Sequence, residues 1–323
     1  MKALLIREYG GPEQLTLEEV GLPSPKSNEV LIKVHAAGVN PVDFKIRNGS
    51  IKAISGSKFP KILGADVAGV VEQNSKHFRV GDKVFAMLNL KGGAYAEYVA
   101  VKESQLAKIP DGFGFAEAAS VPLAALTAFQ SFKKAAVKGG SRVLINGASG
   151  GVGSFAIQIA KAMGAYVVGV TSKRNVDLVR NLGADEVIDY TFSDFTQTTH
   201  KYEMVFDAVA TSSFKKCKRL LEPNGFYITT VPNHGLLWHR FFNLIRSKKA
   251  YFIMVKPLGN DLKILAEWMA QGKLNPVIDA VFPLKEGARA HQVLEMGRTR
   301  GKLVLEVVPS EEKLQAEAIV VEA

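Results

Sequence analysis

One stretch, residues 142–174, constrains the fold of this chain more than any other. A short β-branched run at 142–146 stops at a glycine-rich turn, 147–153, and a second β-branched run follows at 166–170. Between them, apolar residues recur at helical spacing: Val152, Phe155, Ala156, Ile159, Ala160 and Met163. Gly164 stands where a left-handed C-cap would end this helix. The stretch therefore predicts the tight strand–helix–strand unit that dinucleotide-binding folds use.

The glycines of the turn have separate roles. Gly150 lets the backbone approach a pyrophosphate, Gly153 lets the helix pack close to the strand, and the free N–H groups at the helix start attract the anion. The expected pyrophosphate contacts are Ser149, Gly150, Gly151 and Val152. Because Ala148 replaces the first glycine of the usual fingerprint, an ordinary glycine turn is the alternative interpretation. The strand, helix and strand around the turn favour dinucleotide binding.

The end of the second strand indicates which dinucleotide is bound. An NAD site needs a carboxylate there to accept a hydrogen bond from the ribose 2′-OH. This chain instead has Thr171, Ser172, Lys173 and Arg174, with no acid before Asp177. Hydroxyl, ammonium and guanidinium donors suit a dianionic 2′-phosphate. We therefore predict NADPH as the cofactor; the alternative is that Lys173 and Arg174 merely begin a solvated helix.

Length and composition are those of an ordinary globular protein of about two domains. The 323 residues include no apolar run of the ~18 residues that a membrane span needs. The apolar core of residues 1–7 is too short for a secretory signal, so a cytoplasmic location is expected. The single cysteine, Cys217, excludes an intrachain disulfide and a cysteine-based zinc cluster.

The formal net charge of +10 raises the question of nucleic acid or an anionic membrane as a partner. The basic residues form two modest clusters: Lys215, Lys216, Lys218 and Arg219, and then Arg246, Lys248 and Lys249. No nucleic-acid-binding motif accompanies them. A solvated basic surface is the simpler interpretation, and nucleic acid is a disfavoured partner.

The chain in order predicts an α/β protein with two domains. Short strands separated by Gly and Pro turns indicate a small β-rich domain first: 2–7, 29–35, 67–73, 83–87 and 96–101. After the opening strand–helix–strand unit, further strands alternate with helical segments and indicate a doubly wound parallel sheet: 187–190, 204–208, 226–230 and 251–255. Strands at 277–282 and 302–307 are expected to rejoin the β-rich domain. We therefore assign residues 1–124 and 269–323 to the β-rich domain and 125–268 to the nucleotide-binding domain.

Several short motifs, weak singly but specific in this order and spacing, carry a resemblance to a known family. They lie at 38–43, 63–71, 81–84, 93–98, 122–128, 147–153, 182–185 and 301–304. With them the chain resembles the zinc-independent quinone oxidoreductase branch of the medium-chain dehydrogenase/reductase superfamily, over nearly all of residues 1–308. The resemblance implies a GroES-like β-rich catalytic domain and a Rossmann-type doubly wound parallel sheet.

The departures from the zinc alcohol dehydrogenases of that superfamily concern the metal. Where those enzymes place a cysteine ligand this chain has Asn40, and where they place the histidine of Gly-His-Glu it has Ala65, followed by Asp66. The cysteine-rich structural lobe is missing, and the six histidines are scattered without zinc spacing. No metal cofactor is therefore expected.

Without a Lewis acid to polarise an alcohol, reduction of an already activated acceptor becomes the natural reaction. A quinone, or an alkene conjugated to a carbonyl, needs a hydride from NADPH and hydrogen-bond donors near the oxygen where negative charge develops. Two alternatives stay open: a reductase restricted to enals and enones, and a non-catalytic binding protein that uses its basic surface.

The candidates for polar contacts with the substrate are Asn40, Asp43, Lys45, Tyr95 and Thr127. The resemblance places Asn40 and Thr127 near the nicotinamide, with turn and helix-capping duty as the alternative. Lys45 would donate to a developing enolate, paired with Asp43; a surface ion pair is the competing interpretation. The resemblance also puts Tyr190 near the adenine, Phe252, Ile253 and Met254 near the nicotinamide, and Lys302 close to the cofactor phosphates.

Residues 234–250 depart most from the family pattern. Apolar side chains share one helical face there and basic side chains lie largely elsewhere, which predicts an amphipathic helix. It would serve as a lid or core helix beside the substrate cleft, or as a peripheral membrane contact. The oligomeric state stays open, with a homodimer among the alternatives, and the tail 309–323 receives no role.

The metal-free interpretation predicts that activity survives exhaustive chelation. Asn40 and Ala65 replace two ligands, and a single cysteine cannot build a cluster. Elemental analysis of the purified protein should find substoichiometric zinc. One tightly bound zinc ion per chain, lost together with activity, would contradict the interpretation.

Overall fold

The computed structural model describes residues 1–89, 91–231 and 247–308. They form two compact units. The first contains 1–123, 257–266 and the described residues from 278 onward; the second contains 267–277 and the described residues of 124–256. The sequence analysis placed the return to the first domain at residue 269. The chain instead changes unit within helix α9 (Gly259–Ala270), because Gly259 packs on the Leu106 carbonyl whereas the Trp268 ring packs edge-on to Phe129.

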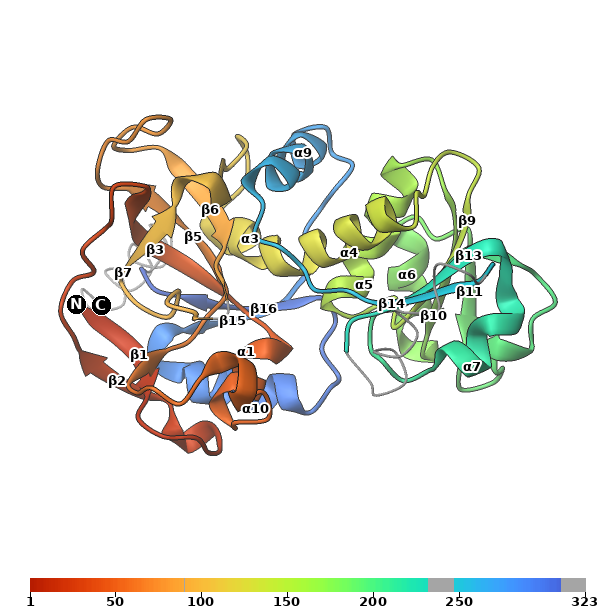
Figure 1. The fold of residues 1–323 in the computed structure, drawn as a ribbon, viewed down its shortest axis with the longest axis horizontal. Helices are drawn as coiled ribbons and strands as arrows, with labels where there is room; N and C mark the ends of the chain where they lie inside the picture. Colours follow the sequence, from red (N-terminus) through yellow and green to blue (C-terminus); the bar gives the residue numbers. More distant parts are fainter. Residues whose placement is uncertain (90, 232–246, 309–323) are drawn as a thin grey trace, which may run out of the picture. The chain divides into compact units, whose positions relative to one another are not determined.

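The first unit is built around a mixed seven-stranded sheet (Figure 1). Its strand order is β15 (Ile278–Pro283), β16 (Lys302–Glu306), β3 (Glu29–Val39), β5 (Asp66–Val71), β6 (Lys83–Met87) and β8 (Leu106–Lys108), with β7 (Tyr98–Lys102) also paired to β3. A smaller sheet has the order β2 (Thr16–Glu19), β1 (Lys2–Ile6) and β4 (Lys61–Ile62). The prediction that the C-terminal strands rejoin the β-rich domain is confirmed.

The long strand β3 is the centre of this sheet. Its first half pairs with β7 and its second half with β16, while β5 pairs along its other edge. Inward-facing side chains such as Ile32 and Val34 alternate with partly exposed ones, as expected for a strand with one buried face. Because the end of β3 is covered on both sides, polar side chains placed there lie in the protein interior.

The first unit contains the helices α1 (Pro41–Arg47), α2 (Lys52–Ser55), α3 (Phe115–Ser120) and α10 (Gly287–Glu295), of which α3 and α10 contact β3. Helix α1 begins directly after β3, with Asn40 as N-cap, Pro41 at the first helical position and Asp43 at the third. Helices α1 and α10 pack against one another (Figure 1).

The second unit is a six-stranded, wholly parallel sheet (Figure 1). Its order is β11 (Glu186–Asp189), β10 (Tyr166–Thr171), β9 (Arg142–Asn146), β12 (Tyr202–Asp207), β13 (Leu221–Thr229) and β14 (Lys249–Phe252). Its helices include α4 (Pro122–Lys134), α5 (Gly151–Ala162), α6 (Val176–Asn181) and α7 (Phe214–Cys217). In chain order the strands run 3-2-1-4-5-6, the dinucleotide-binding arrangement. The predicted doubly wound sheet is confirmed.

Helix α5 follows the sequence prediction closely. Of its predicted apolar face, Phe155, Ala156, Ile159 and Ala160 are fully buried, whereas Val152 and Met163 at its two ends are partly buried. Gly164 ends the helix with φ +79°, the left-handed value that a C-cap glycine adopts. The strand–helix–strand unit on which the sequence analysis depends is therefore present.

Residues 214–220 are helical, because α7 continues into a 3-10 turn at Lys218–Leu220 before the chain enters β13 at Leu221. Other predicted segments lie wholly or partly outside the described residues. Of the proposed amphipathic helix, 234–246 lies outside the described residues, and 247–250 leads into β14. The tail 309–323 also lies outside them. Within the described ranges, no helix has the length and apolar character needed to cross a membrane.

Candidate active site

A buried polar cluster lies at the end of β3 in the first unit, centred on Asn40. The Asn40 amide Nδ2 donates to Asp66 Oδ2 at 2.9 Å, and its Oδ1 accepts from Lys302 Nζ. The three residues come from three neighbouring strand ends: Asn40 follows β3, Asp66 opens β5 and Lys302 opens β16. The strand register pairs Leu303 with Val39 and Gly38 with Asp66, so the three side chains meet in one row.

Asp66 and Lys302 form a charge pair that is removed from water. Their nearest charged atoms, Oδ2 and Nζ, are 3.6 Å apart. Burial raises the pKa of Asp66, and attraction to Lys302 opposes that shift. Burial lowers the pKa of Lys302, with Asp66 and then Asp43 opposing. The Leu123 N–H donates to Asp66 Oδ1 at 2.7 Å, and Lys302 also donates to the Val39 carbonyl at 3.3 Å.

A second carboxyl group, Asp43, lies beside this pair. Its Oδ2 accepts from the Asn40 backbone N–H at 2.8 Å and from the Tyr95 hydroxyl at 3.1 Å. Burial, opposed by the Asn40 N–H and reinforced by Asp66, raises the pKa of Asp43 to about 7. Burial and then Asp43 raise the pKa of Tyr95 well above its usual value, so Tyr95 stays a hydroxyl donor. Asp43 is therefore a carboxyl group that exchanges a proton near neutral pH.

The predicted pairing of Asp43 with Lys45 is not formed. Asp43 is buried and bonded to Asn40 and Tyr95, whereas Lys45 is only partly buried. Residues two apart on a helix point to nearly opposite sides, which explains the difference. Lys302 is held by Asn40, Asp66 and the Val39 carbonyl, and its expected place near the cofactor phosphates stays a prediction.

In the second unit the predicted packing role of Gly153 is confirmed, whereas the predicted contact of Gly150 with a pyrophosphate stays a prediction. A Cβ at Gly153 would lie 2.1 Å from the Gly147 carbonyl oxygen, so the start of α5 packs on the turn only with glycine there. A Cβ at Gly150 would meet that oxygen at an ordinary 3.5 Å. Gly150 is the N-cap of α5, and Gly151 and Val152 open the helix. The free N–H groups at this helix start suit an anion.

Three polar side chains join the turn to the end of β10. The Ser149 hydroxyl accepts from Thr171 Oγ1 at 2.9 Å and from Asn175 Nδ2 at 3.0 Å. With both acceptor positions filled, the Ser149 hydrogen is left to be donated to a further acceptor. Asn175 Oδ1 is buried without a hydrogen-bond partner. A phosphorylated ribose fits this pair, because its anionic oxygens accept from the Ser149 hydroxyl and its hydroxyl groups donate to Asn175 Oδ1.

The other predicted cofactor residues of this unit gather at the same edge of the sheet. Ser172 is partly exposed, and Lys173 and Arg174 are exposed at the end of β10, with Lys173 Nζ 5.6 Å from the Phe192 ring centre. The Tyr190 N–H donates to the Thr171 carbonyl, and its side chain is exposed. Phe252 ends β14, the Ile253 N–H donates to the Thr229 carbonyl, and Met254 is exposed. Because parallel strands end together, these residues share the carboxyl edge.

Thr127 lies in helix α4 of the second unit, where it is almost fully buried. The remaining candidate substrate contacts, Asn40, Asp43, Lys45 and Tyr95, lie in the first unit. The structure brings three of them together, because Asp43 accepts hydrogen bonds from both Asn40 and Tyr95.

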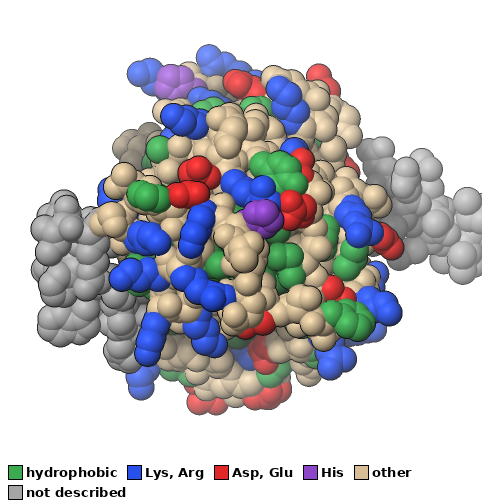
Figure 2. Space-filling view, turned by 90° about the vertical axis from the view of Figure 1, so that its right-hand side faces the viewer, with side chains coloured by type: hydrophobic (Ala, Val, Ile, Leu, Met, Phe, Trp, Pro, Cys, Tyr) green, Lys and Arg blue, Asp and Glu red, His purple; other side chains and the backbone are tan. Residues whose placement is uncertain are grey.

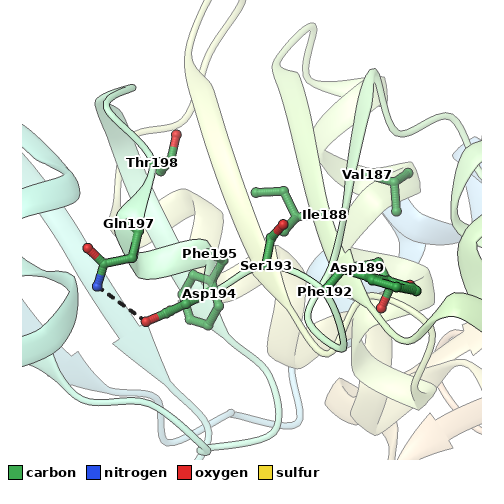
Figure 3. A pocket seen from close by; sticks show the side chains of 9 residues that line it. All are labelled: Val187, Ile188, Asp189, Phe192, Ser193, Asp194, Phe195, Gln197 and Thr198. Carbon is green, nitrogen blue, oxygen red and sulfur yellow. Dashed lines mark hydrogen bonds between the residues drawn. The ribbon is translucent and has the colours of Figure 1, made fainter.

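A pocket of about 410 Å³ opens beyond β11 in the second unit (Figure 3). It is lined by Val187, Ile188, Asp189, Phe192, Ser193, Asp194, Phe195, Gln197 and Thr198, and the Gln197 amide donates to Asp194 at 3.3 Å. None of the predicted cofactor residues lines it. The pocket neighbours the predicted adenine residue Tyr190 in sequence without including it.

The first of the two predicted basic clusters lies within the described residues. Lys215, Lys216, Lys218 and Arg219 are all exposed. Figure 2 shows many Lys and Arg side chains on one face, with Asp and Glu side chains between them. Interspersed charges of this kind keep a protein soluble without defining a partner.

The sequence analysis gave no site role to Asp66, and it missed three residues that extend the buried cluster to the surface. Arg47, His291 and Glu295 continue the hydrogen bonding beyond Tyr95. The available signal was spacing, because Asp43 and Arg47, like His291 and Glu295, are four residues apart and share a helix face.

Comparison with known proteins places the chain in a family. Residues 26–111 match the model of the alcohol dehydrogenase GroES-like domain, and 182–305 that of the zinc-binding dehydrogenase. The chain is 36% identical to the chloroplast envelope quinone oxidoreductase homolog of Arabidopsis thaliana, over 95% of this chain and 98% of the relative. It is also 36% identical to the NADPH-dependent alkenal/one oxidoreductase of the same plant, over 96% of this chain and 80% of the relative.

The solved structure of the quinone oxidoreductase from Coxiella burnetii has the same fold. Its TM-score is 0.87 at 34% identity, over 95% of this chain and 99% of that one. The chain therefore belongs to the medium-chain dehydrogenase/reductase superfamily, in its quinone oxidoreductase branch.

The residues at the family's metal positions do not fit zinc. Of these residues, Ala65 has no ligand atom, and Asn40 uses its side chain on the adjacent Asp66 and on Lys302, whose ammonium already supplies the positive charge. An amide and one carboxylate beside an ammonium are a poor donor set for Zn²⁺, which takes three or four Cys, His, Asp or Glu ligands. Across the described part of the chain, no three such side chains gather in a way that could hold a metal ion.

The turn generates a matched pair of predictions. Gly150→Ala should fold normally, because its Cβ meets only an ordinary contact, yet weaken NADPH binding by about tenfold or more by blocking the backbone's approach to the pyrophosphate. Gly153→Ala should instead lower the thermal stability of the protein, because its Cβ strikes backbone. Fluorescence titration and thermal unfolding measure the two effects. Unchanged cofactor affinity in a folded Gly150→Ala protein would make the turn purely structural.

Proposed function

We propose that this chain is an NADPH-dependent oxidoreductase that transfers a hydride to quinones or α,β-unsaturated carbonyl compounds without a metal ion. The observation that carries the proposal is the Asn40–Asp66–Lys302 cluster, in which an ammonium contacts Asn40, the residue at one of the family's metal positions, and the neighbouring Asp66. The names of the relatives, a quinone oxidoreductase homolog and an NADPH-dependent alkenal/one oxidoreductase, support the substrate class.

The second unit would hold the cofactor at the carboxyl edge of its sheet. Ser149, Gly150, Gly151 and Val152 would bind the pyrophosphate, and Thr171, Ser172, Lys173 and Arg174 the 2′-phosphate. Tyr190 would contact the adenine, and Asn40, Thr127, Phe252, Ile253 and Met254 the nicotinamide. When bound, NADPH supplies a hydride from its nicotinamide ring.

The first unit would serve the acceptor. Reduction of a quinone or enone places negative charge on a carbonyl oxygen, and a preorganised cation in a site closed to water stabilises such charge strongly. Lys302 is such a cation, fixed by Asn40 and the Val39 carbonyl. Asp43 holds an exchangeable proton near neutral pH, and Lys45 is a further donor candidate. The low-dielectric surroundings make each of these charges effective.

A panel of acceptors tests the proposal. NADPH oxidation, followed by absorbance, should proceed with quinones, with enones, or with both. Turnover with enones and enals alone would favour the alternative function, a reductase restricted to those substrates. An absence of turnover with every acceptor, together with salt-sensitive RNA binding, would overturn the proposal in favour of a binding protein.

Cofactor choice gives a sharper prediction. The double variant Lys173→Ala/Arg174→Ala should lose preference for NADPH over NADH by at least about tenfold, because each charge-assisted contact with the 2′-phosphate contributes about 1.5–3 kcal/mol. Steady-state kinetics with both cofactors measures the ratio. Arg180→Ala, which removes an exposed cation of α6 paired with Asp177, is the matched control and should leave the ratio unchanged. Equal losses with NADPH and NADH would place the phosphate elsewhere.

A further inference from the structure

A row of hydrogen-bonded side chains runs through the first unit from its surface to Asp43. Arg47 donates to Glu295 through one terminal nitrogen and lies 3.3 Å from His291 Nδ1 through the other. His291 Nε2 is 3.3 Å from the Tyr95 hydroxyl, which in turn is 3.1 Å from Asp43 Oδ2. Helix α1 supplies Asp43 and Arg47, and helix α10 supplies His291 and Glu295.

Only one end of this row reaches water. Arg47, His291, Tyr95 and Asp43 are each at most 1% exposed, whereas the Glu295 side chain is 33% exposed. Buried polar atoms are costly without partners, so each member depends on its neighbours for hydrogen bonds. Arg47 is held further by its Nε–H, which donates to the Gly10 carbonyl at 3.2 Å.

The chemistry of Arg47 fixes the direction of every bond that follows. A guanidinium group has donors and no acceptor, so His291 Nδ1 must accept from it. Burial, and then the charge of Arg47, lower the pKa of His291 to about 3, so the ring carries one proton at neutral pH. That proton must reside on Nε2, which donates to the Tyr95 oxygen. The hydrogen of the Tyr95 hydroxyl is then directed to Asp43.

We propose that Arg47 locks His291 in its Nε2–H tautomer and thereby aims the Tyr95 hydroxyl at the Asp43 carboxylate. Arg47 and His291 are positioning residues. They act on Asp43 through the Tyr95 hydroxyl and do not contact Asp43 themselves. The inference about the tautomer stands on its own, and its relevance to catalysis rests on the proposed function.

The fixed tautomer of His291 affects the titration of Asp43. The groups that face this carboxyl are the Asn40 N–H, the Tyr95 hydroxyl, the Asp66 carboxylate and the Lys302 ammonium. With the opposite tautomer, His291 Nε2 would accept, Tyr95 would donate to it, and Asp43 would lose one donor. A carboxylate with fewer donors keeps its proton to higher pH. Loss of Arg47 should therefore move the titration of Asp43 to higher pH.

Nitrogen-15 NMR of the whole chain reads the tautomer directly. Long-range proton–nitrogen correlations distinguish Nε2–H from Nδ1–H, and a His291→Gln protein identifies its signals among those of the six histidines. We expect Nε2–H at neutral pH. A neutral Nδ1–H ring, or a doubly protonated ring, would overturn the proposal whether or not the protein is a reductase.

Variants test the coupling to Asp43. In Arg47→Met the Nε2–H signature should be lost, and the carbon-13 titration of the Asp43 carboxyl should move up by about one pH unit. Arg47→Lys keeps a group that can only donate hydrogen bonds, so it should restore the Nε2–H signature of His291 and the original titration of Asp43. Arg289→Met, which removes an exposed arginine of α10 paired with Glu286, is the matched control and should change neither.

A second variant keeps the proposal testable if Arg47→Met fails to fold. Tyr95→Phe keeps the ring and removes the aimed hydroxyl, so Asp43 should titrate about one unit higher while His291 stays Nε2–H. The pH profile of kcat/KM should move in the same direction. An unchanged Asp43 titration in Tyr95→Phe would contradict the proposal.

Discussion

The first unit depends on one constraint, which is that two carboxyl groups and one ammonium are buried together. Asp43, Asp66 and Lys302 are all almost fully removed from water, and an unpaired buried charge costs several kcal/mol. Their pairing requires three neighbouring strands to end in register, with α1 starting directly after the central one. The fold around Asn40 is therefore the arrangement that keeps these charges compensated.

The same constraint explains why Asp43 titrates near neutral pH. With Asp43 protonated, the Asp66 carboxylate and the Lys302 ammonium sum to zero charge, whereas ionised Asp43 leaves a net negative charge in a buried space. Burial favours the neutral state, and the donors from Asn40 and Tyr95 oppose it, so the pKa of Asp43 is about 7. A site of this kind holds a proton beside a fixed cation, as reduction of a conjugated carbonyl requires.

Sequence reasoning succeeded where the pattern was local. The strand–helix–strand unit at 142–174 has strong periodicity and a glycine cap, and the structure contains it with the expected buried face. Asn40, Asp43 and Tyr95 were grouped by motif, and the structure places them in contact. The Asp43–Lys45 pairing failed because the seven-residue helix α1 was not anticipated, and helix geometry separates the two side chains.

Contacts set by strand register or by distant helices could not be read from the sequence. Lys302 meets Asn40 across 262 positions of the chain, and Arg47 meets His291 across 244. The pairing of β16 with β3 brings Lys302 to Asn40 and Asp66, a contact that the resemblance did not assign. No local pattern encodes such a meeting.

The central claim is that a hydride passes from NADPH directly to a carbon of the acceptor. Reduction of an enone with NADPH carrying two deuterium atoms at C4, in ordinary water and with chelator present, tests it most directly. The account predicts deuterium at the carbon β to the carbonyl of the product and a solvent hydrogen at the α carbon. A product without deuterium, formed while NADPH is oxidised, would contradict the account.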